Sequence, residues 1–124
     1  MSKVAVITGS SGELGTELVN IFIDDGYLTI GLDILPRTKN YNKRFHFIET
    51  DLSVFPKDYK YRICVIESIK ELIPDDVHKI ILINNAAQQI LNKFDDIKYN
   101  DWYKSFAVNT LSPFFLTQGL FEQL

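Results

Sequence analysis

The sequence predicts an α/β fold: one domain, covering residues 1–124, in which helices pack on both faces of a doubly wound parallel sheet. Two observations support this prediction. Short apolar runs alternate with longer segments in which apolar residues recur at helical spacing. The first run, residues 4–8, is rich in β-branched side chains, which is typical of a parallel strand buried on both faces. Parallel strands that alternate with helices are joined by right-handed crossovers.

The remaining elements follow in order along the chain. A helix is predicted from Leu14 onward, and its apolar spacing stops at Gly26. Strands are predicted at residues 27–33, 45–49 and 79–84, and the polar segment 36–44 is predicted as a loop. Two further helices are predicted at residues 59–73, closed by Pro74, and at residues 101–124, with Asp101 as the candidate N-cap.

Composition and charge exclude several classes of protein. Apolar residues make up 46% and charged residues 23% of the chain, which is ordinary for a folded domain and argues against disorder. A net charge of -3 gives no reason to expect nucleic acid or an anionic membrane as a partner. The apolar start, residues 1–7, is too short for a signal peptide or a membrane span, so we expect a cytoplasmic location.

Cysteine and histidine residues give no sign of a reactive or metal site. Cys64 has no second cysteine to pair with, and its neighbours Ile63 and Val65 predict a buried structural thiol in a reducing compartment. His46 and His78 are interpreted as structural residues at strand positions. No Cys/His cluster has the spacing of metal ligands, so no metal is expected.

The strongest local motif is the glycine-rich segment of residues 8–15, between the first strand and the first helix. Gly9 permits a tight turn, and Gly12 lets the backbone approach a pyrophosphate. Gly15 lets the helix pack closely on the sheet, and the helix N-terminus offers free N–H groups to the phosphates. The alternative for this segment alone is a purely structural turn.

Asp33 strengthens the interpretation of this loop as a nucleotide site. It ends the second strand, 18 positions after Gly15, close to the spacing of a ribose-binding acid. Its carboxylate would accept hydrogen bonds from both ribose hydroxyls and repel a 2′-phosphate, so NAD is favoured over NADP. Arg37 and Lys39 follow closely and leave NADP as the alternative. Together the loop and Asp33 predict a Rossmann-type dinucleotide-binding domain.

Two further segments complete a resemblance. Asp51-Leu52 follows the third strand, and Asn84-Asn85-Ala86-Ala87 follows the fourth. With the glycine loop and Asp33, the chain resembles the first half of a short-chain dehydrogenase/reductase over essentially its whole length. The resemblance implies a sheet of strand order 3-2-1-4, with the remainder of the family's sheet missing.

The resemblance also implies roles for individual residues. In that family the aspartate after the third strand, here Asp51, bonds the adenine amino group, and the segment after the fourth strand lies against the adenosine ribose. Asn109 matches a helical asparagine that helps to hold a water in the proton relay, and is the candidate catalytic residue. The residues expected at the dinucleotide are Gly9, Ser11, Gly12, Leu14, Gly15, Asp33, Asp51, Leu52, Asn85, Ala86 and Ala87.

The sequence departs from the family pattern in three places. Gly12 comes one position early, so Glu13 stands where compact members have glycine, and this spacing is commoner in the extended branch. Ala87 replaces a glycine. The family's serine and Tyr-x-x-x-Lys pair would follow Leu124, and no Tyr-x-x-x-Lys occurs in these residues. We therefore expect the nucleotide-binding half of an oxidoreductase that is inactive alone; the alternative is a non-catalytic dinucleotide-binding or assembly module.

Self-association is the last expectation. Without a fifth strand, residues 79–84 form an edge strand that is apolar on both faces, and such an edge can pair with another chain. The last predicted helix adds a second apolar surface, and family members commonly dimerise through it. Its apolar residues are Val108, Leu111, Phe114, Phe115 and Leu116. We expect association through the edge, the helix or both.

Overall fold

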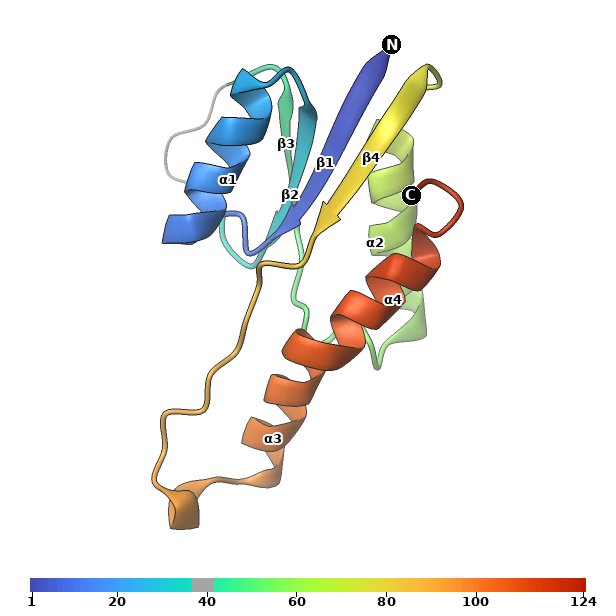
Figure 1. Ribbon diagram of the computed structural model, residues 1–124. Coiled ribbons are helices and arrows are strands. Elements are labelled where there is room, and N and C mark those ends of the chain that lie inside the picture. The colour runs from blue at the N-terminus through green and yellow to red at the C-terminus, as the bar shows by residue number, and fades with distance from the viewer. Residues whose placement is uncertain (37–41) are drawn as a thin grey trace.

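The computed structural model describes residues 1–36 and 42–124. Within them, four strands form one parallel sheet in the order β3-β2-β1-β4 (Figure 1). The strands are β1 Ser2–Thr8, β2 Leu28–Asp33, β3 Phe45–Glu49 and β4 Val77–Ile83. The predicted parallel sheet and its strand order are confirmed. The predicted phosphate-binding alternatives, Arg37 and Lys39, lie outside the described residues.

Helices cover both faces of the sheet, as predicted. α1, Glu13–Asp24, packs on one face, and α2, Tyr59–Leu72, packs on the other together with α4, Ser112–Gly119 (Figure 1). Gly26 follows α1 with a φ of 84°, which glycine adopts without strain and which turns the chain into β2.

The core is built around β1, whose successive side chains point to opposite faces of the sheet. Val4 and Val6 pack with the residues of α2 and α4, whereas Ala5 and Ile7 pack with those of α1. All four side chains are completely buried. This burial on both faces explains why the segment has no polar alternation.

The helix predicted at residues 101–124 is in fact three consecutive pieces. α3 spans Tyr99–Phe106, one π-helical turn spans Ala107–Leu111, and α4 ends at Gly119. Asp101 is not the N-cap, because α3 already begins at Tyr99 and Lys98 occupies the N-cap position. Instead, Asp101 Oδ2 accepts a hydrogen bond of 2.9 Å from the Lys98 N–H. Asp101 thus stabilises the helix start from inside its first turn.

The apolar residues of this helical segment do not all form an exposed surface. Leu116 is completely buried, and Phe115 packs against the same core. Phe114 is exposed, as are the aromatic rings of Trp102 and Phe106 on α3. The expectation of an open apolar helix surface is therefore wrong for Leu116, since α4 packs on the sheet face beside α2.

Cys64 on α2 is exposed, contrary to the predicted buried thiol. The buried side chains of α2 are Val65, Ile66 and Ile69, and Ile63 is exposed like Cys64.

Among the described residues, no helix has both the length and the apolar character needed to span a bilayer.

Candidate functional site

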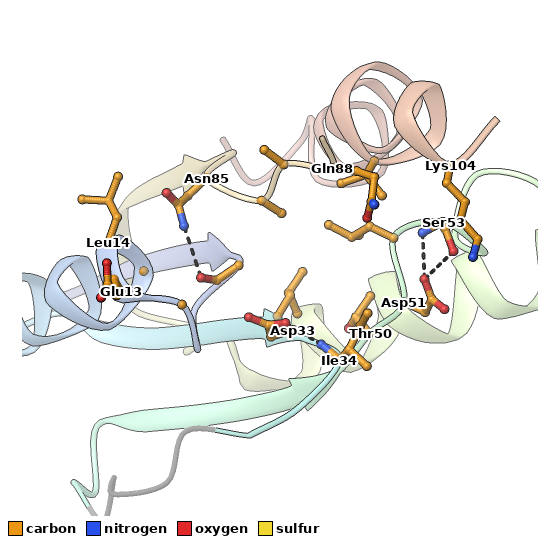
Figure 2. Close-up of a pocket in the computed structure, with 18 residues that line it drawn as sticks. Glu13, Leu14, Asp33, Ile34, Thr50, Asp51, Ser53, Asn85, Gln88 and Lys104 are labelled. Atoms are coloured by element: carbon orange, nitrogen blue, oxygen red, sulfur yellow. Dashed lines mark hydrogen bonds between the residues drawn. The ribbon is translucent and has the colours of Figure 1, made fainter. Parts of the chain in front are cut away.

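A cleft of about 520 Å³ lies where the four strands reach their carboxyl ends. Figure 2 shows Asp33, Asp51 and Asn85 reaching it from the ends of β2, β3 and β4. Ligand sites in open parallel sheets form at this edge, because the connecting loops diverge there. The structure brings together in this cleft Gly9, Gly12, Leu14, Gly15, Asp33, Asp51, Leu52, Asn85, Ala86 and Ala87. Their contact with a dinucleotide stays a prediction.

The three loop glycines are needed for different reasons. Gly9 has a φ of 65°, and a Cβ there would lie 3.0 Å from Ala86 Cα. A Cβ on Gly15 would overlap the Gly9 carbonyl oxygen, so α1 could not start where it does. At Gly12 a Cβ would meet only that same oxygen, at an ordinary 3.7 Å, and the backbone there is extended. The fold thus requires glycine at positions 9 and 15 but not at position 12.

The start of α1 is open toward an anion. Its N-cap, Gly12, offers no side chain to accept a hydrogen bond from the first turn. Those N–H groups have no carbonyl partner inside the helix, and the helix dipole adds positive potential at this end. Gly12, Glu13, Leu14 and Gly15 all line the cleft, so the helix start faces it. The carboxylate of Glu13 is a negative charge at the same end, and it lowers the attraction for phosphate.

Asp33 is held from both sides. Its Oδ2 accepts a hydrogen bond of 2.9 Å from the Ser11 N–H, and its Oδ1 accepts one of 2.7 Å from the Ile34 N–H. Ser11 does not line the main cleft, and its hydroxyl donates to the Leu35 carbonyl oxygen. Each carboxylate oxygen keeps a further lone pair for a ligand donor. Ser11 therefore orients Asp33 and the segment that follows β2.

Asn85 ties β4 to the glycine loop. Its backbone N–H and that of Ala86 donate to Thr8 Oγ1 at 3.0 and 2.9 Å. Its side-chain Nδ2 donates to the carbonyl oxygen of Thr8 at 3.1 Å and to that of Gly9 at 3.2 Å, the second bond being drawn in Figure 2. These four bonds hold the end of β4 against the end of β1 and the glycine loop.

Asn109 does not line the cleft, but it binds the backbone of Gln88, which does. Its Oδ1 accepts from the Gln88 N–H and its Nδ2 donates to the Gln88 carbonyl oxygen, each at 2.8 Å. Nδ2 also reaches Ser105 Oγ at 3.3 Å. The side chain thus holds the segment after Ala87 against the π-helical turn. A role for Asn109 in a proton relay stays a prediction.

Several cleft residues were not predicted from the sequence. Thr50 and Ser53 flank the Asp51-Leu52 motif, and Gln88 follows the Asn85 motif. Lys104 and Val108 come from the helical segment, and Lys104 lies at the same end of the cleft as Asp51 and Ser53 (Figure 2). Lys104 and Val108 are four residues apart, which places them on one helix face. This spacing is the sequence pattern that could have predicted that both line the cleft.

The model of one family, described as short chain dehydrogenase, matches residues 3–124. The chain belongs to the short-chain dehydrogenase family. It is 25% identical to an acetoacetyl-CoA reductase of Acinetobacter sp. (strain RA3849), over 98% of this chain and 50% of that protein. It is 28% identical to an NAD-dependent glycerol dehydrogenase of Listeria innocua, over 94% of this chain and 45% of that protein. This short-chain dehydrogenase chain thus spans about half the length of these relatives.

Solved structures of the family share the fold. A short-chain dehydrogenase from Leptospira borgpetersenii with bound NAD⁺ superposes with a TM-score of 0.81 at 28% identity, over 99% of this chain and 46% of that one. A short-chain dehydrogenase/reductase from Burkholderia vietnamiensis reaches 0.82 at 18% identity, over 96% and 56%. The first likeness confirms the Rossmann-type sheet predicted for this short-chain dehydrogenase chain, and the second supports the fold alone.

Proposed function

We propose that this chain is the NAD-binding part of an oxidoreductase that moves a hydride between a nicotinamide cofactor and an alcohol or carbonyl. The observation that carries this proposal is the Asp33 carboxylate, held at the end of β2 by the Ser11 N–H and lining the cleft beside the glycine loop. It is supported by 28% identity to the Leptospira protein with bound NAD⁺. The nicotinamide, when bound, supplies the hydride chemistry, and the protein binds and orients it.

The cleft fits a dinucleotide at its adenosine end. Gly12 has no Cβ although the fold tolerates one, so its bare backbone leaves room for the pyrophosphate beside the helix start. The remaining lone pairs of Asp33 would accept the ribose hydroxyls, and its negative charge would oppose a 2′-phosphate. NAD is therefore the proposed cofactor, ahead of NADP.

Turnover requires a proton donor besides the bound nicotinamide. In the resemblance described above, that donor is a tyrosine beside a lysine, and no Tyr-x-x-x-Lys occurs in the 124 residues. These residues would thus bind the cofactor but give no complete catalytic site. A non-catalytic dinucleotide-binding or assembly module remains the second proposal, since it needs the cleft but no proton donor.

We also propose that the chain associates with a second copy. β4 is an edge strand, and Ile80–Ile83 on it are only half-buried. Trp102, Phe106 and Phe114 are each more than half exposed along α3 and α4. Exposed apolar surface of this kind and an exposed strand edge are each features of protein interfaces.

Calorimetric titration of the chain with NAD and with NADP tests the main proposal. We expect saturable binding of NAD with weaker binding of NADP. Binding of neither nucleotide would overturn the proposed function, and a preference for NADP would overturn the role given to Asp33.

A further inference from the structure

The loop that follows β3 is held by hydrogen bonds from two helices and from its own residues. The Asp51 N–H donates to Tyr61 Oη at 2.8 Å, and the buried Ser112 Oγ donates to the Leu52 carbonyl oxygen at 2.7 Å. Asp51 Oδ1 accepts from the N–H and the hydroxyl of Ser53 at 2.9 and 2.6 Å (Figure 2). Anchors from α2, from α4 and from the loop itself thus meet at two consecutive residues of the cleft.

These anchors leave one ligand-binding atom available. Asp51 Oδ1 is occupied by Ser53, whereas Oδ2 has no hydrogen-bond partner among the described residues. Asp51 lines the cleft, so Oδ2 can accept from a ligand donor there. The orientation of that oxygen depends on the Asp51 backbone, and the Tyr61 hydroxyl is the group that binds this backbone N–H.

Tyr61 is itself fixed at both ends. Its N–H donates to Asp58 Oδ1 at 3.0 Å, which caps the start of α2, and its ring packs against the core. The hydroxyl therefore reaches Asp51 from a rigid base. Removal of the hydroxyl alone leaves the ring in the core and the helix cap in place, and takes away only the acceptor of the Asp51 N–H.

On the basis of the proposed function, we propose that Tyr61 is a positioning residue for base selectivity. The family resemblance implies that Asp51 bonds the exocyclic amino group of adenine; the role proposed for Tyr61 is to hold Asp51 so that Oδ2 can accept that hydrogen bond. Hypoxanthine carries a carbonyl oxygen in place of that amino group. A carbonyl oxygen facing a carboxylate oxygen is repulsive, so a well-placed Asp51 selects adenine against hypoxanthine.

The test compares NAD with nicotinamide hypoxanthine dinucleotide by calorimetric titration. The proteins are the parent chain, Tyr61→Phe and the control Tyr59→Phe. Tyr59 lies on the same helix and is 67% exposed, and among the described residues its hydroxyl makes no hydrogen bond to Asp51, so its variant makes the same chemical change without removing the Asp51 anchor. Circular dichroism checks that each variant is folded.

We expect the parent to bind NAD about tenfold more tightly than the hypoxanthine analogue, which is the order expected for one hydrogen bond to a charged group. Tyr61→Phe should reduce this ratio to about twofold, mainly through weaker NAD binding, and Tyr59→Phe should keep the parent ratio. Ser53→Ala, which removes the hydroxyl bond to Asp51 Oδ1, should reduce the ratio in the same direction and serves if Tyr61→Phe does not fold.

The possible failures are distinguishable. If the parent binds neither dinucleotide, the proposed function fails and this inference fails with it. If the parent selects NAD but Tyr61→Phe keeps the same ratio, or loses affinity for both ligands equally, Tyr61 has no positioning role and only this inference is overturned.

Discussion

The Ser11 N–H donates a hydrogen bond of 2.9 Å to Asp33 Oδ2, and this bond joins the glycine loop to the end of β2. The two residues are 22 positions apart, and the contact forms because β1 and β2 are neighbours in the sheet. A carboxylate fixed in this way has its charge in place before a ligand arrives. Such preorganisation lowers the cost of ordering side chains on binding.

Replacement of Asp33 by alanine should therefore weaken the binding of NAD more than the binding of NADP. The variant loses the hydrogen bonds that the ribose hydroxyls donate to a charged acceptor, each contributing about 1.5–3 kcal/mol, and so we expect at least a tenfold loss of affinity for NAD. NADP should lose less, because the repulsion of its 2′-phosphate is removed at the same time. Calorimetry on the variant measures both affinities, and equal losses would refute the ribose-binding role of Asp33.

Replacement of Gly12 by valine should abolish dinucleotide binding and leave the fold largely intact. A Cβ at this position has only an ordinary contact with the Gly9 carbonyl oxygen, whereas the branched side chain would fill the approach to the helix start. The matched control is Gly15→Ala, whose Cβ would overlap that same oxygen. Gly15→Ala should lower the melting temperature followed by circular dichroism, and Gly12→Val should not. Parent-like NAD affinity in Gly12→Val would exclude the phosphate site.

The 124-residue chain should show no NAD-dependent oxidation or reduction above background. The reason is chemical: a bound nicotinamide transfers a hydride only when a matched proton donor is in place. Absorbance of NADH followed with a panel of alcohols and carbonyl compounds measures this directly. Steady turnover by the pure chain would mean that one of its own residues supplies the proton.

Sedimentation velocity should show a species larger than a monomer at micromolar concentration. The half-buried edge strand β4 and the exposed rings of Trp102, Phe106 and Phe114 are the surfaces expected to be covered. Trp102→Lys and Phe106→Lys should shift the equilibrium toward monomer if the helix carries the contact. A compact, cooperatively folding monomer of the parent chain would contradict self-association.

The sheet was predictable from the sequence because a parallel strand buried on both faces is a continuous run of apolar residues. Val4 and Val6 pack on the face covered by α2, and Ala5 and Ile7 pack on the face covered by α1. All four positions therefore require apolar side chains.

The predicted residues Asp33, Asp51 and Asn85 gather at the cleft because each follows a strand, and parallel strands end at one edge. Lys104 and Val108 reach the same cleft from the helical segment and were not predicted.

Side-chain placement within helices was harder to predict. Ile63 and Val65 flank Cys64 in sequence, but neighbouring helical residues differ by about 100° in direction, and only Val65 faces the core. The bond from Ser112 to Leu52 joins residues 60 positions apart and depends on how α4 packs. No local pattern carries such information.

The break in the last helix was also invisible to periodicity. A π-helical turn inserts its extra residue without disturbing the apolar pattern enough to be noticed, and here it falls at Ala107–Leu111. Asn109 lies in that turn and pairs with the backbone of Gln88. Gln88 lies 21 positions from Asn109, so this pairing has no local signal in the sequence.

The most direct test of the central claim, that the cleft at the strand ends binds NAD, is a titration of the isotope-labelled chain with NAD followed by the backbone amide signals. We predict that the largest changes occur at Ser11, Gly12, Ile34, Leu52 and Ala86, with the signals of α2 beyond its first turn unchanged. Saturation at these amides would place the dinucleotide across the glycine loop and the ends of β2, β3 and β4. Changes confined to other surfaces, or no saturable change at all, would contradict it.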